Sequence, residues 1–244
     1  MVSPISFGAF KIGRNQKTKY PGEYELPSEQ QVRDLFAKLF EMGINLVDTA
    51  PAYGVSEERI GQTIADRREE YVLSTKVGEV FQDGQSSYCF TGDHARKSIE
   101  QSLAKLRVEY VDLLFVHSDG NDIANQRDTD LVETFKQIKA EGKARHIGFS
   151  GKTPEGASLA LQWADVLMVE YNIDNQSHEQ VIAEAGSLGV GVLAKKAIGS
   201  GWLDAEKAIT FALSNPNVHS LVIGGLNPDH MAANVATASR IQSG

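Results

Sequence analysis

The regular alternation of short apolar runs with amphipathic segments is the feature that most constrains how this chain folds. Eight runs have the length and composition of buried β-strands, at residues 5–10, 45–50, 71–76, 111–117, 144–150, 166–171, 191–196 and 221–225. Segments with helical character follow them, at residues 29–42, from 57, from 93, 130–140, 154–163, 179–188, 204–213 and from 228. Eight strands alternating with eight helices predict an α/β protein, a (β/α)8 TIM barrel, rather than an open doubly wound sheet.

Capping residues and glycines support these boundaries. Ser28 and Ser56 stand where they would cap the first two helices, and Gly43 ends the first of them. The stretch 78–92, rich in Gly, Gln and Ser, is expected to be the longest irregular segment. No Gly-x-Gly-x-x-Gly motif follows a strand, which argues further against the open dinucleotide-binding fold.

Length, charge and cysteine content limit the class of protein. The 244 residues fit one large α/β domain, which we expect to span residues 1–244. The net charge of −8 argues against a nucleic-acid partner and against an anionic membrane surface. The six histidines and the single cysteine, Cys89, form no metal-ligand motif, so we expect no metal. The sequence has no secretory signal and no apolar run near the ~20 residues of a membrane span, which predicts a cytoplasmic protein.

Four polar side chains fall at or just after the carboxyl ends of three successive strands. Asp48 lies near the end of the second strand, and Tyr53 lies in the loop after it. Lys76 ends the third strand and His117 ends the fourth. Taken singly, these residues would be a helix cap, a surface tyrosine and a core histidine. In a parallel barrel those strand ends meet on one face, so we expect the four side chains to form one site.

These residues and their surroundings resemble the aldo-keto reductase family. The resemblance rests on Asp-Thr-Ala-Pro-Ala-Tyr-Gly at 48–54, Ser-Thr-Lys-Val at 74–77, Gly-Phe-Ser at 148–150, Glu-Tyr-Asn at 170–172 and Asn-Pro-Asp-His at 227–230. It extends from about Gly8 to Asn234, nearly the whole chain. The resemblance implies hydride transfer between a nicotinamide cofactor and a carbonyl carbon of a small-molecule substrate, with proton transfer to the carbonyl oxygen.

Each of the four side chains has a physical role in such chemistry. By resemblance, Tyr53 is the general acid in reduction, although a free phenol is a weak acid at neutral pH. A neighbouring Lys76 would favour the phenolate, and Asp48 would keep that lysine charged and oriented. His117 would donate or accept a hydrogen bond at the carbonyl oxygen.

The cofactor-binding residues that the resemblance implies differ from the usual family pattern. Ser150 is retained, but Gly151 replaces the asparagine, Met168 the glutamine and Lys195 the stacking aromatic residue of many members. Lys195 and Lys196 would either reach cofactor phosphates or remain as solvent-exposed lysines. Lys152 would fill part of the role of the missing asparagine.

The last strand-to-helix turn usually binds the 2′-phosphate of NADP(H). The corresponding residues here are Gly224, Gly225, Asn227, His230 and Asn234. Two glycines and a histidine stand where some members have lysine, serine and arginine. The glycines and the helix N-terminus would still bind phosphate through backbone N–H groups. NADP(H) is therefore the expected cofactor with a modest preference, and NAD(H) is the alternative.

The substrate pocket is the part that the sequence defines least. The loop after the seventh strand and the C-terminal tail are shorter than in many family members, so we expect fewer residues to cover the cofactor and substrate. Phe10 is the expected substrate contact beside Tyr53 and His117, with further candidates among Phe81, Tyr88, Phe90 and Trp202.

Two other functions compete with a carbonyl reductase. A cofactor-binding regulatory or sensor protein would keep the fold with little turnover, and the altered nicotinamide site favours it. A lyase that forms a Schiff base through a strand-end lysine is a more remote alternative. The complete set Asp48, Tyr53, Lys76 and His117 favours the reductase, because a protein that only binds the cofactor needs neither Tyr53 nor Lys76.

Overall fold

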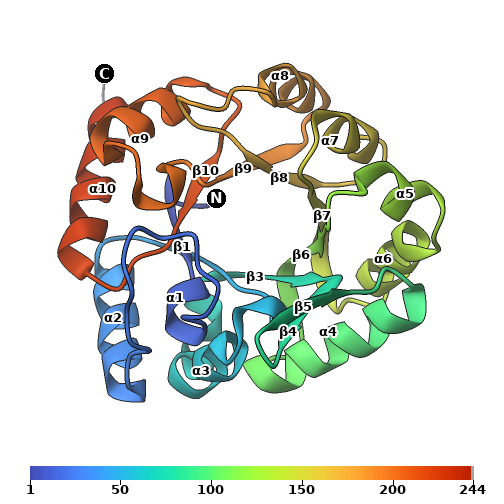
Figure 1. The fold of residues 1–244 in the computed structure, drawn as a ribbon, viewed down its shortest axis with the longest axis horizontal. Coiled ribbons are helices and arrows are strands. Elements are labelled where there is room, and N and C mark those ends of the chain that lie inside the picture. Colours follow the sequence, from blue (N-terminus) through green and yellow to red (C-terminus); the bar gives the residue numbers. More distant parts are fainter. Residues whose placement is uncertain (243–244) are drawn as a thin grey trace.

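The computed structural model, which describes residues 1–242, is a closed barrel of eight parallel strands surrounded by helices (Figure 1). The strands follow the order β1-β10-β9-β8-β7-β6-β3-β2 around the barrel. Their bounds are β1 Ile5–Gly8, β2 Leu46–Asp48, β3 Val72–Val77, β6 Val111–His117, β7 Ala144–Ser150, β8 Val166–Glu170, β9 Gly191–Lys195 and β10 Ser220–Ile223. The predicted (β/α)8 fold is confirmed; the predicted domain end at Gly244 lies outside the described residues.

Helices form a ring outside the strands (Figure 1), because each of the longer ones carries an apolar face that packs on the strands. Their bounds are α2 Glu29–Glu41, α3 Ser56–Thr63, α4 Gly92–Leu106, α6 Leu131–Ala140, α7 Pro154–Ala160, α8 Glu179–Leu188, α9 Ala205–Ser214 and α10 Pro228–Gln242. Short additional helices are α1 Phe10–Gly13 and α5 Asp122–Arg127, with 3-10 turns η1 Pro51–Tyr53, η2 Ala65–Glu70 and η3 Gly199–Gly201.

The strands are buried on both faces, as parallel strands between helices and a barrel interior must be. One large apolar cluster fills the space between strands and helices. A smaller cluster fills the barrel interior and consists of Leu46, Leu113, Phe115, Met168 and Leu193. Side chains alternate along a strand, so the residues two positions beyond these interior residues face the carboxyl end of the barrel axis. Asp48, His117 and Lys195 occupy such positions, and the strand ends thus carry polar groups directly above an apolar floor.

Helix caps follow the prediction at one position and depart from it at another. Ser28 and Gln31 form a reciprocal capping box at the start of α2, as Ser28 was expected to do. Ser56 does not cap α3; it is the first residue of that helix, and its Oγ donates to the carbonyl of Ala9 at 2.9 Å. Ser56 also accepts from Oγ1 of Thr49, so it joins the loops after β1 and β2.

The expected irregular segment 78–92 is largely a β-hairpin, and this prediction was wrong. Strands β4 Glu79–Gln82 and β5 Gln85–Tyr88 pair antiparallel through the turn residues Asp83 and Gly84. Both turn residues have positive φ, 51° and 74°, as a tight hairpin turn of the Asp-Gly type requires. The polar, exposed composition of β5 hid the strand, because no apolar alternation marks it. The hairpin contacts η1, which carries Tyr53.

Candidate active site

Asp48 and Lys76 form a buried ion pair at the carboxyl ends of β2 and β3. Nζ of Lys76 lies 2.7 Å from both carboxylate oxygens of Asp48, and it donates a third hydrogen bond to the carbonyl of Thr49 at 2.9 Å. Oγ of Ser74 adds a hydrogen bond to Asp48. Lys76 and Asp48 are only 1% and 2% exposed. Burial lowers the pKa of Lys76, and the charge of Asp48 opposes that shift.

The phenol of Tyr53 lies over this pair. Nζ of Lys76 is 4.9 Å from the centre of the Tyr53 ring. Burial raises the pKa of Tyr53 well above its ordinary value, Asp48 and Glu79 raise it further, and Arg14 opposes them. The expected lowering of the Tyr53 pKa by Lys76 does not outweigh burial, which is the largest of these effects. The phenol is therefore a protonated group, available as a proton donor.

His117 lies at the end of β6. It is the last of the four predicted catalytic residues, Asp48, Tyr53, Lys76 and His117, which we call the quartet. Its ring stands edge-on to Tyr53, with 6.1 Å between the ring centres and 90° between the planes. Its Nδ1 lies 3.3 Å from Oε2 of Glu79 in the hairpin. Burial lowers the pKa of His117 well below its ordinary value, and the cations around it, Lys76 first, add to the effect. The imidazole is thus neutral. The structure brings Asp48, Tyr53, Lys76 and His117 together on one face.

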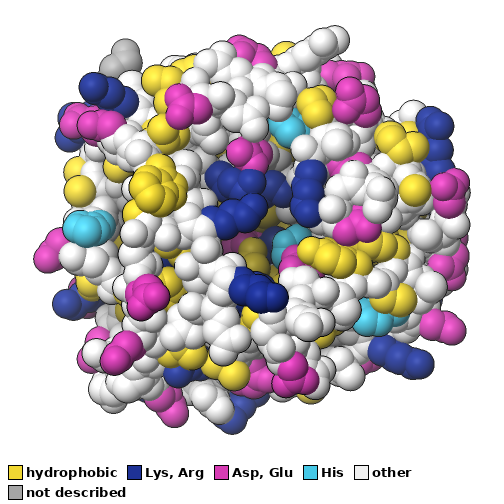
Figure 2. All heavy atoms as spheres, in the orientation of Figure 1, with side chains coloured by type: hydrophobic (Ala, Val, Ile, Leu, Met, Phe, Trp, Pro, Cys, Tyr) yellow, Lys and Arg dark blue, Asp and Glu magenta, His cyan; other side chains and the backbone are white. Residues whose placement is uncertain are grey.

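Cations gather around the mouth of the barrel, although the protein as a whole is acidic. Figure 2 shows lysine and arginine side chains around the hollow at the centre of the face seen in Figure 1. Arg14 lies against the ring of Phe81, with 3.3 Å from its guanidinium carbon to the ring centre. Arg14 also donates to the carbonyls of Gln16 and Ala52. Such a mouth attracts an anionic ligand.

The residues predicted around the nicotinamide occupy different depths. Nζ of Lys195 donates to Oγ of Ser150 at 3.0 Å and to the carbonyl of Gly151 at 2.7 Å. Desolvation, with Lys196 and Lys76 nearby, lowers the pKa of Lys195 to about 7. Met168 lies one layer deeper, in the barrel interior at 1% exposure, where its side chain faces apolar neighbours.

Two other lysines at the mouth are held by oxygen atoms of the protein. Nζ of Lys196 forms an ion pair with Glu170. Nζ of Lys152 donates to the carbonyl of Asp119 at 2.8 Å. Lys152 also lies over the ring of Tyr88, 6.0 Å from its centre.

A cavity of about 540 Å³ lies beside the turn between β10 and α10. All the residues predicted at this turn line it: Gly224, Gly225, Asn227, His230 and Asn234. Lys11 and Tyr24 contribute a further part of the wall, and Ile198 and Leu203 make part of it apolar. Backbone N–H groups, the N-terminus of α10 and an ammonium group beside apolar side chains suit an adenosine phosphate.

Sequence reasoning missed Lys11, Arg14 and Glu79 at this face. Lys11 is in α1, within a stretch predicted as strand and loop, and its Nζ stacks over the ring of Tyr20 at 4.0 Å. Glu79 comes three residues after Lys76, and the Asp-Gly turn at 83–84 was the available signal that its segment folds back as a hairpin. No comparable sequence signal marks Lys11 or Arg14.

The predicted substrate-contacting aromatics lie in three places. Phe10 packs edge-on against Tyr53, with 5.2 Å between ring centres, so it borders the quartet. Phe81, Tyr88 and Phe90 belong to the hairpin or its base, where Tyr88 stacks on Phe90 at 6.3 Å. Trp202 is 69% exposed and donates from Nε1 to the carbonyl of Lys19, so it lies at the rim.

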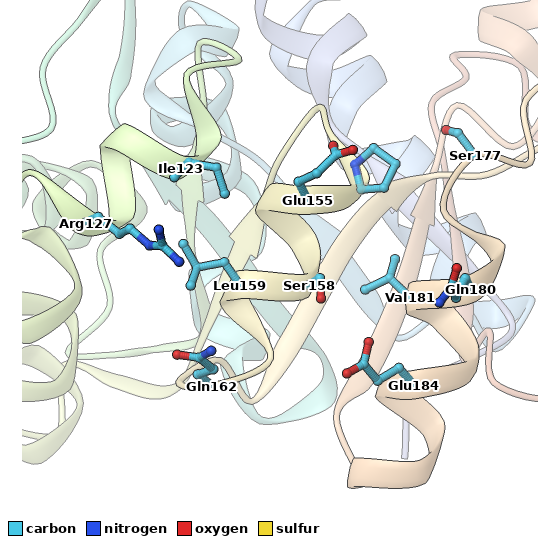
Figure 3. Close-up of a pocket in the computed structure, with 11 residues that line it drawn as sticks. Ile123, Arg127, Glu155, Ser158, Leu159, Gln162, Ser177, Gln180, Val181 and Glu184 are labelled. Carbon is cyan, nitrogen blue, oxygen red and sulfur yellow. The ribbon is translucent and has the colours of Figure 1, made fainter.

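A separate groove lies on the outside of the barrel. It has a volume of about 500 Å³ and runs between α5, α7 and α8, with Ile123, Leu159 and Val181 among its lining residues (Figure 3). None of the predicted site residues lines it. Within residues 1–242, no group of three or more His, Cys, Asp or Glu is arranged to hold a metal ion. The helices in that part of the chain are all too short or too polar to cross a membrane.

Fold and site together define the class of protein: a (β/α)8 barrel with an Asp–Lys pair, a tyrosine and a histidine clustered at the strand ends. The model of the Aldo/keto reductase family matches residues 4–209, well over half of the chain. The chain belongs to the aldo-keto reductase family and is an oxidoreductase of the kind that uses a nicotinamide cofactor.

Individual relatives agree with this assignment. The solved structure of PA4992 of Pseudomonas aeruginosa, assigned to the aldo-keto reductases, is 39% identical, covers 99% of this chain and 92% of that one, and superposes with a TM-score of 0.92. L-galactose dehydrogenase of Arabidopsis thaliana is 24% identical over 99% of this chain and 86% of that protein. NADH-specific methylglyoxal reductase of Escherichia coli is 29% identical over 60% of this chain and 49% of that protein.

Proposed function

We propose that this protein reduces aldehydes or ketones to alcohols with NADPH, using Tyr53 as the proton donor. The observation that carries the proposal is the Lys76–Asp48 ion pair beneath the Tyr53 ring, beside His117. When bound, the cofactor supplies a hydride to the carbonyl carbon. Because the phenol is protonated, Tyr53 can deliver a proton to the developing alkoxide.

The other residues of the quartet prepare Tyr53 for this role. The ammonium of Lys76 lies 4.9 Å from the ring centre and stabilises the phenolate left after the proton has moved. Asp48 holds that ammonium through both carboxylate oxygens, which fixes its position. The ion pair as a whole carries no net charge. Phe10 packs edge-on against the phenol ring and so covers one side of it.

The cofactor assignment rests on the cavity beside α10. Its Gly224–Gly225 backbone, its helix N-terminus and the residues Asn227, His230 and Asn234 fit the adenosine phosphate end. At the other end, Ser150 and Lys195 fit the nicotinamide carboxamide, as a hydroxyl donor and an N–H donor. The E. coli relative named as NADH-specific supports NADH as the alternative cofactor.

The proposal is tested by following NADPH and NADH oxidation with a panel of aromatic aldehydes, short aliphatic aldehydes, sugars and diketones. Alcohol oxidation by NADP+ should be assayed alongside, because relatives include proteins named as dehydrogenases. Turnover of at least one carbonyl class supports the proposal. Cofactor binding without turnover across the panel would support a sensor protein instead, the reading favoured by Lys195 in place of an aromatic residue.

Lys11 should supply the positive charge that the β10–α10 turn lacks. We expect Lys11→Ala to weaken NADPH binding by about 10- to 150-fold, the loss of one charged hydrogen bond, and NADH binding much less. His230→Ala tests the competing ligand on α10, and Lys38→Ala on the exposed face of α2 is the matched control. Dissociation constants from fluorescence titration check this. Equal losses for both cofactors in Lys11→Ala would mean that Lys11 does not bind the 2′-phosphate.

A further inference from the structure

Glu79 is a largely buried charged group in contact with His117 that the proposed reaction does not use. Its Oε2 lies 3.3 Å from Nδ1 of His117, and the two side chains are only 14% and 18% exposed. Nδ1 is buried and makes no hydrogen bond in the present geometry, and Oε2 of Glu79 lies within hydrogen-bond distance of it. The second oxygen, Oε1, accepts a hydrogen bond from Ser86 across the hairpin at 2.7 Å, which anchors the carboxylate.

The backbone brings Glu79 to this place. Gly78 has φ +124°, and a Cβ on it would lie 2.6 Å from the ring of Phe90 and 3.0 Å from the carbonyl of His117. Only glycine lets β3 turn into β4 so close to the end of β6. The amide of Cys89 donates to the carbonyl of Gly78 at 2.9 Å and closes the base of the hairpin. The position of Glu79 against His117 is therefore set by main-chain geometry.

The imidazole has one ring proton, and the surrounding charges explain why. Burial holds the pKa of His117 well below the ordinary value, and four cations act in the same direction: Lys76 of β3, Lys195 of β9, Lys152 after β7 and Arg14 after α1. A neutral imidazole donates from one nitrogen and accepts at the other. A carboxylate can only accept, so the nitrogen that faces Glu79 carries the proton.

We propose that Glu79 is a positioning residue that fixes His117 with its proton on Nδ1, which leaves Nε2 as a hydrogen-bond acceptor toward the substrate. This inference rests on the proposed function only for the identity of the substrate site. An acceptor nitrogen repels a bare carbonyl oxygen and binds a hydroxyl group. The site therefore selects substrates that carry a hydroxyl group next to the reacting carbonyl, and Tyr53 alone donates to the carbonyl oxygen.

Glu79→Gln reverses the polarity of this contact with little change in volume. The amide oxygen of glutamine can still accept from Ser86, while its NH2 group donates to Nδ1 and moves the ring proton to Nε2. Nitrogen-15 NMR of the ligand-free protein, with histidine labelled and the His117 signal assigned by its absence in His117→Phe, should show Nδ1 protonated in the wild type and Nε2 protonated in Glu79→Gln. Glu155→Gln on the exposed face of α7 makes the same charge change away from the site and should change neither.

Kinetics provide the second readout, with 2-hydroxypropanal and propanal as a matched pair of probes. The wild type should favour the hydroxyaldehyde in kcat/KM, and Glu79→Gln should reduce that ratio about tenfold, the scale of one hydrogen bond. A wild-type His117 protonated on Nε2 would overturn the proposal, and so would an unchanged ratio in Glu79→Gln. Inactivity on both aldehydes with the tautomer switch intact would count against the proposed reduction and support the action of Glu79 on His117.

Discussion

Tyr53→Phe should lower carbonyl reduction by about 10²-fold or more while cofactor binding stays within a few-fold of the wild type. The substitution removes one oxygen atom and leaves the ring that packs against Phe10 and His117. The remaining side chains replace this proton donor poorly. His117 is neutral because burial and nearby cations depress its pKa, and the Lys76 ammonium is held by Asp48 and Thr49.

The measurement is single-turnover reduction under saturating cofactor, with Tyr110→Phe as the control. Tyr110 precedes β6 at the opposite end of the barrel, where its hydroxyl accepts from Arg145. Full activity in Tyr53→Phe would show that the proton comes from another group or from water. The pKa of Tyr53 lies well above its ordinary value of 10, so Tyr53 should stay protonated up to about pH 10. At any pH below that value, loss of this proton should not slow the wild-type enzyme.

The sequence was sufficient to predict the barrel and the cluster of four residues at its mouth. Strand residues alternate between faces, so an apolar residue two positions before Asp48 or His117 identifies the inner face, as Leu46 and Phe115 do. The carboxyl ends of parallel strands meet, and their polar residues therefore cluster without any knowledge of loop structure. The prediction of the fold and of this cluster depended on local periodicity and on topology alone.

The first feature that the periodicity of the sequence did not predict was how deep each inward-facing residue lies along the barrel axis. Met168 and Lys195 are both on inner faces, yet Met168 lies in the interior layer and Lys195 at the mouth. Register explains the difference: Glu170 pairs with Lys195, so Met168 lies two residues below the polar strand ends, at the level of Leu193. Strand register depends on how neighbouring strands are staggered, which a single strand's sequence does not specify.

Loop geometry was the second feature that the periodicity of the sequence did not predict. Glu79 and Lys11 reach the mouth through a hairpin and a one-turn helix, which are positioned by contacts with η1 and with Tyr20 and Tyr24. The Asp83–Gly84 turn signalled the hairpin, but nothing in the local pattern showed which side of it faces His117. Contacts between segments distant in sequence are set by tertiary packing, so their partners follow only from the assembled fold.

The largest expected effect on stability is that of Lys76→Met. This change leaves the Asp48 carboxylate, 2% exposed, without its counter-ion, and the free energy of unfolding should fall by about 3–5 kcal/mol. The hydrogen bonds from Ser74 to Asp48 and from Lys76 to Thr49 make both partners members of one network. Methionine matches the length of the lysine stem, so lost packing contributes little to the effect.

The double variant Asp48→Asn/Lys76→Met removes both charges. It therefore separates the effect of an unpaired buried charge from the other effects of the Lys76 substitution. With no charge left in the pair, it should unfold less readily than either single variant, although it is equally inactive in catalysis. Urea unfolding of the wild type, both single variants and the double variant gives the coupling free energy directly, because the two side chains are in contact at 2.7 Å. Additive losses, with the double variant the least stable of the four proteins, would contradict an uncompensated Asp48 charge as the cause. If the double variant recovers stability but not carbonyl reduction, the ion pair is needed for the reaction of Tyr53 and not for folding. The barrel would then fold without the charges of Asp48 and Lys76, whereas the phenol would not react without them.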